Sequence, residues 1–139
     1  MTTLPVGRYE GKELDPNATP FLLSIGYKEE VATRFGSCKS DMTFSKTGEN
    51  EYVLNISQPP INRSQDIPFT LGDEKTTTMP SGKTMKSLFD WIPAENKLDC
   101  TYSNSDGVSW RIVYQFRVDG VSMIRDSATV HTFSDFQRV

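Results

Sequence analysis

The chain has 139 residues, a net charge of −3 and an apolar fraction of 36%. This length suits a single domain spanning residues 1–139, and the charge gives no broad positive field, so we expect no nucleic-acid partner. No apolar run reaches the roughly 18 residues of a transmembrane helix, and the N-terminal residues have neither the basic nor the apolar segment of a signal peptide. We therefore expect a cytoplasmic protein.

The first predicted elements are one strand and two short helices. Residues 6–14 read as a strand that two glycines loosen. A cap residue followed by proline then occurs twice, at Asp15-Pro16 and at Thr19-Pro20, and either pair can begin a helix that ends at Gly26. A second helix is predicted for residues 27–35, with a glycine as its C-terminal stop. The two helices are too short to be stable alone, so they must pack on another part of the chain.

After the helices, short runs of alternating apolar and polar residues are separated by turn residues, a pattern typical of a β-sandwich or barrel. The middle of the chain holds three runs, residues 67–71, 75–79 and 84–89, with turns at Gly72-Asp73 and Pro80-Ser81-Gly82. We expect these three runs to form an antiparallel meander. The remaining strands are predicted at residues 41–46, 52–56, 98–102, 110–116, 121–128 and 129–138.

Four motifs stand out in this order: Val6-Gly7-Arg8-Tyr9, Ala32-Thr33-Arg34, Phe69-x-Leu-Gly-x-Glu74 and Gly82-Lys83-x-Met85-Lys86-Ser87. With these motifs and spacings, nearly the whole chain resembles the intracellular lipid-binding proteins, the fatty-acid-binding and cellular retinoid-binding group. The resemblance implies an all-β fold, a ten-stranded antiparallel up-and-down barrel of the lipocalin-like (calycin) type, capped by a helix-turn-helix lid. It also implies that the barrel binds and transports a fatty acid, a retinoid or a related lipid, without a covalent bond, cofactor or metal.

The chain departs from this family where a ligand carboxylate is usually held. Many members use Arg-x-Tyr near the C-terminus, and alignment from the end places Ser134 and Phe136 at those two positions. The family's other inward polar anchor falls at Tyr114 or Gln115. Because a buried carboxylate without a cation costs several kcal/mol, we hypothesise a neutral or weakly polar lipid, or a fatty acid in a looser pose. An inward-facing Arg125 would restore carboxylate binding.

The strand at residues 110–116 has two possible registers. Its pattern favours the inward set Trp110, Ile112, Tyr114 and Phe116. The alternative places Arg111, Val113, Gln115 and Arg117 inside, which is costly unless the two charges meet an acid.

Alternation and the family resemblance together give the candidate ligand-binding residues. The helix face would close the portal, together with Asn62 and the turn at residues 80–83, and residues of the strands would line the wall. For the two methionines of this set, plain core packing is an equal alternative, since Met fills irregular space in either role. Tyr9 and Phe69 are assigned to the core. The candidates are Phe21, Leu22, Ile25, Met42, Gln58, Met85, Tyr114, Gln115, Arg125, Ser134 and Phe136.

No feature of the sequence indicates an enzyme. His131, the single histidine, falls on the outer face of its strand, and no cysteine or serine has an activating sequence context. Cys38 and Cys100 lack the spacing of a metal site or a disulfide framework. We expect a monomer whose lid, through Lys28 and Arg34, contacts membranes transiently. The alternative is an interaction or protective barrel protein with little selective ligand binding.

Overall fold

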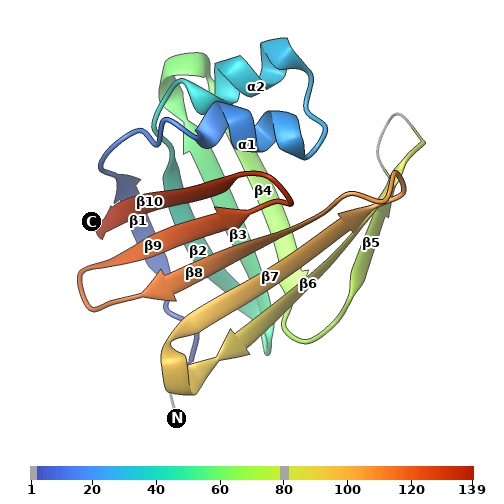
Figure 1. The fold of residues 1–139 in the computed structure, drawn as a ribbon. Coiled ribbons are helices and arrows are strands. Elements are labelled where there is room, and N and C mark those ends of the chain that lie inside the picture. Colours follow the sequence, from blue (N-terminus) through green and yellow to red (C-terminus); the bar gives the residue numbers. More distant parts are fainter. Residues whose placement is uncertain (1–2, 79–81) are drawn as a thin grey trace.

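The computed structural model describes residues 3–78 and 82–139, and in this part of the chain ten strands form one antiparallel sheet. The helices are α1 (Ala18–Ser24) and α2 (Glu29–Gly36), and the strands are β1 (Gly7–Gly11), β2 (Asp41–Gly48), β3 (Glu51–Gln58), β4 (Arg63–Thr70), β5 (Lys75–Thr78), β6 (Thr84–Ile92), β7 (Lys97–Asn104), β8 (Ser109–Phe116), β9 (Gly120–Asp126) and β10 (His131–Arg138). The strand order is β4-β3-β2-β1-β10-β9-β8-β7-β6-β5. Figure 1 shows the sheet curled into a nearly closed barrel with both helices over one end, which confirms the expected architecture.

The expected meander in the middle of the chain is wrong at its first turn. Strands β4 and β5 follow each other in sequence but lie at opposite ends of the strand order, and no backbone ladder joins them. The connecting turn is instead held by other elements, because the amide of Leu71 donates to Asn50 and that of Gly72 donates to Phe89. Pro68 also has no N–H to contribute on β4. The expected turn at residues 80–82 lies partly outside the described residues.

The same four-residue connection joins two pairs of strands. Pro59–Ile61 and Pro93–Glu95 each form one turn of 3₁₀ helix, and each is followed by an asparagine. Asn62 and Asn96 adopt the left-handed conformation, with φ of 52° and 50°. Asparagine tolerates this conformation better than other residues with a Cβ atom, so a Pro-x-x-Asn sequence accounts for both strand connections.

Aromatic side chains fill the half of the barrel that is remote from the helices. The ring of Phe44 lies 5.3 Å from that of Phe116 and 6.2 Å from that of Tyr9, in edge-to-face contacts, and Phe69 stacks on Phe89 at 4.3 Å. Such pairs contribute about 0.5–1.5 kcal/mol beyond the area they bury. Tyr9 and Phe69 are therefore core residues, as the sequence predicted.

The two helices begin and end at other residues than the sequence indicated. Neither proline pair begins α1; Asn17 is its N-cap residue, and Gly26, with φ of 105°, lies in the connection to α2. The carboxylate of Asp15 instead accepts hydrogen bonds from the amides of Asn17 (2.7 Å) and Phe133 (2.6 Å), so it fixes the segment before α1 to β10. Among the described residues, no helix has the length and apolar character that crossing a bilayer requires.

The two helices are in close contact at Gly36, and we expect a methyl group there to disturb the lid. A Cβ atom at position 36 would lie 2.7 Å from the backbone nitrogen of Thr19, so Gly36→Ala must push α1 and α2 apart. Overpacking of this kind costs about 1–3 kcal/mol. Native-state hydrogen exchange of the α1 and α2 amides should become correspondingly faster.

Thr33→Ala is the matched control, because Thr33 is an exposed residue of the same helix and surface changes usually stay within about 0.5 kcal/mol. Unchanged lid protection in Gly36→Ala would contradict the close helix contact.

The two cysteines should differ strongly in reactivity. Cys100 has no exposed surface and belongs to the barrel core, and burial raises the pKa of its thiol well above the usual value. Cys38, just after α2, is partly exposed. Because the thiolate is the reactive form, an aromatic disulfide reagent at mildly alkaline pH should modify one thiol of the native protein quickly.

The Cys38→Ser variant should lose that fast reaction, whereas Cys100→Ala should keep it. Modification of both thiols of the native protein at similar rates would show that Cys100 is accessible.

Candidate functional site

A cavity of about 360 Å³ lies between the barrel wall and the helices. On β6, Met85 and Ser87 line this cavity, whereas Phe89, further along the strand, belongs to the filled core. The same division holds on β3, where Gln58 lines the cavity and Leu54 does not. The barrel is therefore solid in one half and hollow beneath the lid, and the volume falls in the range of small-molecule pockets.

The structure brings together all but one of the eleven candidate ligand-binding residues; the turn at residues 80–83, proposed for the portal, lies partly outside the described residues. The three lid residues close the cavity from above, and the others contribute to its wall from β2, β3, β6, β8, β9 and β10. Asn62, proposed for the portal, does not line the cavity. The cavity-lining candidates are Phe21, Leu22, Ile25, Met42, Gln58, Met85, Tyr114, Arg125, Ser134 and Phe136.

Gln115 is the exception, and its placement corrects the proposal. Its amide nitrogen donates to the backbone oxygens of Glu95 (2.6 Å) and Asn96 (3.3 Å) on the outer side of the wall. Tyr114 points into the cavity, so the register favoured by the alternation pattern is confirmed. Arg111 accordingly lies outside and binds Asp99 through two hydrogen bonds of 2.7 Å, which hold the pKa of that carboxyl below its usual value.

Arg125 and three hydroxyl-bearing side chains form a polar patch on a largely apolar wall. In the sheet, Arg125 of β9 lies directly opposite Ile112 of β8 and Thr132 of β10. The next inward-facing positions on β8 and β10, one step further from the lid, are Tyr114 and Ser134. The Nε atom of Arg125 donates to Thr132 Oγ1 at 3.1 Å. Cross-strand pairing thus gathers these groups beneath the lid.

The guanidinium group of Arg125 is only partly satisfied by the protein. Within the described residues, no acidic side chain forms an ion pair with it, and its two terminal nitrogens have no hydrogen-bond partner. Every fully enclosed side-chain nitrogen among these residues has a hydrogen-bond partner. The two terminal nitrogens of Arg125 have none, so they are not fully enclosed and are accessible from the cavity. Desolvation lowers the pKa of Arg125, and Tyr114 and Asp15 partly oppose this effect. The guanidinium also lies over the ring of Phe21, 4.9 Å from its centroid.

A second arginine, Arg63 at the start of β4, lies at the mouth of the cavity. Its terminal nitrogens donate to the side-chain oxygens of Gln58 (2.8 Å) and Gln65 (2.6 Å), and its guanidinium lies 3.9 Å from the ring centroid of Phe35. Desolvation lowers its pKa as well. Sequence reasoning missed this residue because it began the strand at Ile67.

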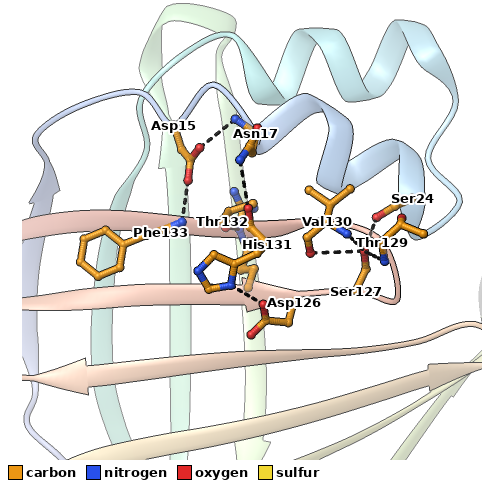
Figure 2. A network of polar contacts seen from close by, with 11 residues as sticks. Asp15, Asn17, Ser24, Asp126, Ser127, Thr129, Val130, His131, Thr132 and Phe133 are labelled. Carbon is orange, nitrogen blue, oxygen red and sulfur yellow. Dashed lines mark hydrogen bonds and ion pairs between the residues drawn. The ribbon is translucent and has the colours of Figure 1, made fainter.

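Polar contacts fix each lid helix to a different part of the wall. Figure 2 shows those of α1: Asn17 donates to the backbone oxygen of His131 at 3.1 Å, and Ser24 donates to Ser127 at 2.7 Å. His131 lies on the outer face, as predicted, and pairs with Asp126.

On the other side of the mouth, Gln58 donates to the backbone oxygens of Phe35 (2.7 Å) and Cys38 (3.0 Å). The first helix is therefore held by β10 and the turn after β9, and the second by the end of β3.

Comparison with known proteins shows the fold. No protein-family model and no curated protein sequence matches this chain. Lipid binding protein 8 of Caenorhabditis elegans is similar in structure with a TM-score of 0.81 and 12% identity, covering 96% of this chain and 94% of that one. A Schistosoma mansoni fatty acid binding protein in complex with arachidonic acid gives 0.80 and 16%, covering 96% and 95%. An abundant heat soluble protein from Ramazzottius varieornatus gives 0.81 and 19%, covering 100% and 98%. This chain thus has the fold of the fatty-acid-binding proteins.

Proposed function

We propose that this protein is a divergent intracellular lipid-binding protein that holds a small hydrophobic ligand with an acidic head group, non-covalently, in its cavity. The apolar wall beneath the lid and the structural likeness to fatty-acid-binding proteins support ligand binding. We further propose that it acts as a cytoplasmic monomer that transports this ligand. Catalysis is no part of the proposal, since the single histidine pairs with Asp126 on the outer face.

The observation that supports the acidic head group is that the guanidinium of Arg125 has no acidic partner among the described residues. The neutral-lipid hypothesis depended on a cavity without an inward cation, whereas Arg125 lines the wall. A partly buried charge without a partner is costly to the folded protein, and residues that break such a rule are expected at functional sites. A ligand carboxylate would accept hydrogen bonds from its two terminal nitrogens, with the hydroxyls of Tyr114 and Ser134 close by on the same wall.

The acyl chain and the head group would contribute differently to binding. Burial of each CH₂ contributes about 0.8 kcal/mol, and association and ordering cost an estimated 4–15 kcal/mol. A long apolar chain can therefore supply the net affinity by itself. Hydrogen bonds to a charged group contribute about 1.5–3 kcal/mol, so Arg125 would decide between an acid and a neutral lipid of the same length.

The outer surface of the lid supports a proposal for delivery to membranes. Leu23, Tyr27 and Val31 are exposed on the lid, with Lys28 and Arg34 nearby in the sequence. Apolar side chains beside basic ones suit a transient contact with an anionic lipid surface.

A protective barrel with little selective binding is the second candidate function, and the likeness to the abundant heat soluble protein favours it. Native mass spectrometry of the freshly purified protein distinguishes the two candidates. A bound lipid that survives purification supports ligand carriage, and an empty barrel that takes up no added fatty acid supports the protective role.

The head-group assignment predicts how affinity changes with ligand and with residue 125. Calorimetric titration should show that dodecanoic acid binds the wild type roughly tenfold or more tightly than dodecanol, in line with one or two charge-assisted hydrogen bonds. Arg125→Met should remove this preference and leave the affinity for dodecanol nearly unchanged. Arg111→Met is the matched control, because Arg111 lies on the outer face and pairs with Asp99. An acid preference that survives Arg125→Met would show that another group binds the carboxylate.

Arg125→Met should also leave the ligand-free protein as stable as the wild type, or more stable. The substitution removes a guanidinium without an acidic partner from a desolvated position and keeps an apolar side chain against Phe21, at the loss of one hydrogen bond to Thr132 Oγ1. Replacement of poorly compensated buried charge by apolar groups is often neutral or stabilising by about 1–4 kcal/mol. Urea unfolding measures this change, and a clear loss of stability would show that Arg125 has a structural role.

A further inference from the structure

The two arginines of the cavity come from opposite sides of the barrel. Arg63 begins β4 and Arg125 lies near the end of β9, and four strands separate β4 from β9 in the sheet order. Ten strands spaced about 4.8 Å apart and tilted by about 40° give the wall a diameter of roughly 20 Å. Figure 1 shows β4 on the far side of the barrel and β9 on the near side, with the helices above both. The two side chains thus approach one cavity from facing walls.

Both guanidinium groups are hydrogen-bonded only to neutral groups of the described residues. Arg63 is bound by two neutral amides and Arg125 by one hydroxyl. In the described part of the chain, neither forms an ion pair with an acidic residue. Each lies on a phenylalanine of a different lid helix, Phe35 for Arg63 and Phe21 for Arg125. These contacts with aromatic rings offset part of the desolvation cost but add no negative charge.

The acidic residues on the cavity wall form no ion pair with either arginine, although Asp15 acts on Arg125 from a distance. Asp15 uses both carboxylate oxygens for backbone amides, and Asp66 accepts a hydrogen bond from Asn55 at 2.8 Å. Glu13, which also lines the cavity, is exposed and forms no ion pair with either arginine. Among the described residues, four cationic side chains line the cavity. Lys39 and Lys75 are exposed and donate to the backbone oxygens of Lys12 and Pro68. Arg63 and Arg125 are therefore the two partly buried cations of the wall, and neither forms an ion pair with a described acidic residue.

We infer that the ligand is an apolar molecule with two acidic groups at its two ends or edges, one bound by Arg125 and the other by Arg63. This inference rests on the proposed function and narrows its ligand class from simple fatty acids to diacids. A cavity of about 360 Å³ has room for one small ligand rather than for two acyl chains. A site with one cation discriminates against a second carboxylate, which must lose its water without a partner; a site with two cations reverses that preference.

A diacid and its monomethyl ester form the matched ligand pair for the test, because they differ by one charge and have nearly the same apolar length. Decanedioic, dodecanedioic and hexadecanedioic acids and their monomethyl esters are titrated calorimetrically into the full chain. At the best chain length, the diacid should bind about tenfold more tightly than its ester, the effect of one charge-assisted hydrogen bond. Arg63→Gln should abolish or reverse the preference, and Arg63→Lys, which keeps the charge, should retain part of it.

Arg111→Gln serves as the control on the outer face and should keep the full diacid preference. Equal or weaker binding of the diacid at every chain length, or a preference that Arg63→Gln leaves unchanged, would overturn the inference. Nile red, a neutral dye, and dodecanoic acid test the proposed function separately. If both bind and the diacid preference is missing, only the two-acid inference fails; if neither the dye nor any of the acids binds, ligand carriage itself fails.

Discussion

The structure depends on the geometry of a sheet that closes on itself. Ten strands enclose more space than inward side chains fill, and in this chain the excess is concentrated in one half. Large rings such as Phe44, Phe89 and Phe116 pack the base, whereas Met85, Ser87 and Ser134 leave room beneath the lid. The aromatic base gives the fold its stability and the smaller or more flexible side chains give it a cavity, so stability and ligand space occupy separate parts of the same wall.

The lid is connected to the charges of the cavity through its aromatic side chains. Phe21 of α1 lies against Arg125, and Phe35 of α2 lies against Arg63. Any group that draws a guanidinium toward the cavity therefore acts on the helix that rests on it. The polar contacts of the two helices likewise go to different strands.

Most of the architecture could be predicted because its signals are local. Alternation on β8 was strong enough to place Tyr114 inside and Arg111 outside, and proline, asparagine and glycine marked most of the turns. The β4–β5 break could not be predicted from the sequence, since neighbouring strands with a glycine turn resemble a hairpin. Its cause is tertiary: backbone contacts to Asn50 and Phe89 hold the connecting turn.

The candidate site was predicted less completely, for a similar reason. Inward positions follow from alternation, which left an inward-facing Arg125 as one possibility. Alternation could not show that no acidic side chain would lie beside its guanidinium group. Arg63 is the first residue of its strand, directly after a 3₁₀ turn. No strand residue precedes it, so the alternation of apolar and polar residues could not show whether it faces inward. Gln115 was included because the register of the hairpin was open, and its amide satisfies the Pro93–Glu95 connection instead.

The interruption between β4 and β5 leaves one line along the barrel wall where no backbone hydrogen bonds join neighbouring strands. Ile67 and Pro68 on one edge and Lys75 and Thr77 on the other border the cavity. A 3.3 Å hydrogen bond from Lys75 Nζ to the oxygen of Pro68 links the two edges. Separating β4 from β5 breaks no backbone hydrogen bonds between strands, whereas separating any other pair of neighbouring strands breaks several. A bulkier occupant of the cavity would therefore be accommodated by widening of the wall along this line near the lid, because the stack of Phe69 on Phe89 holds the two sides together at the base.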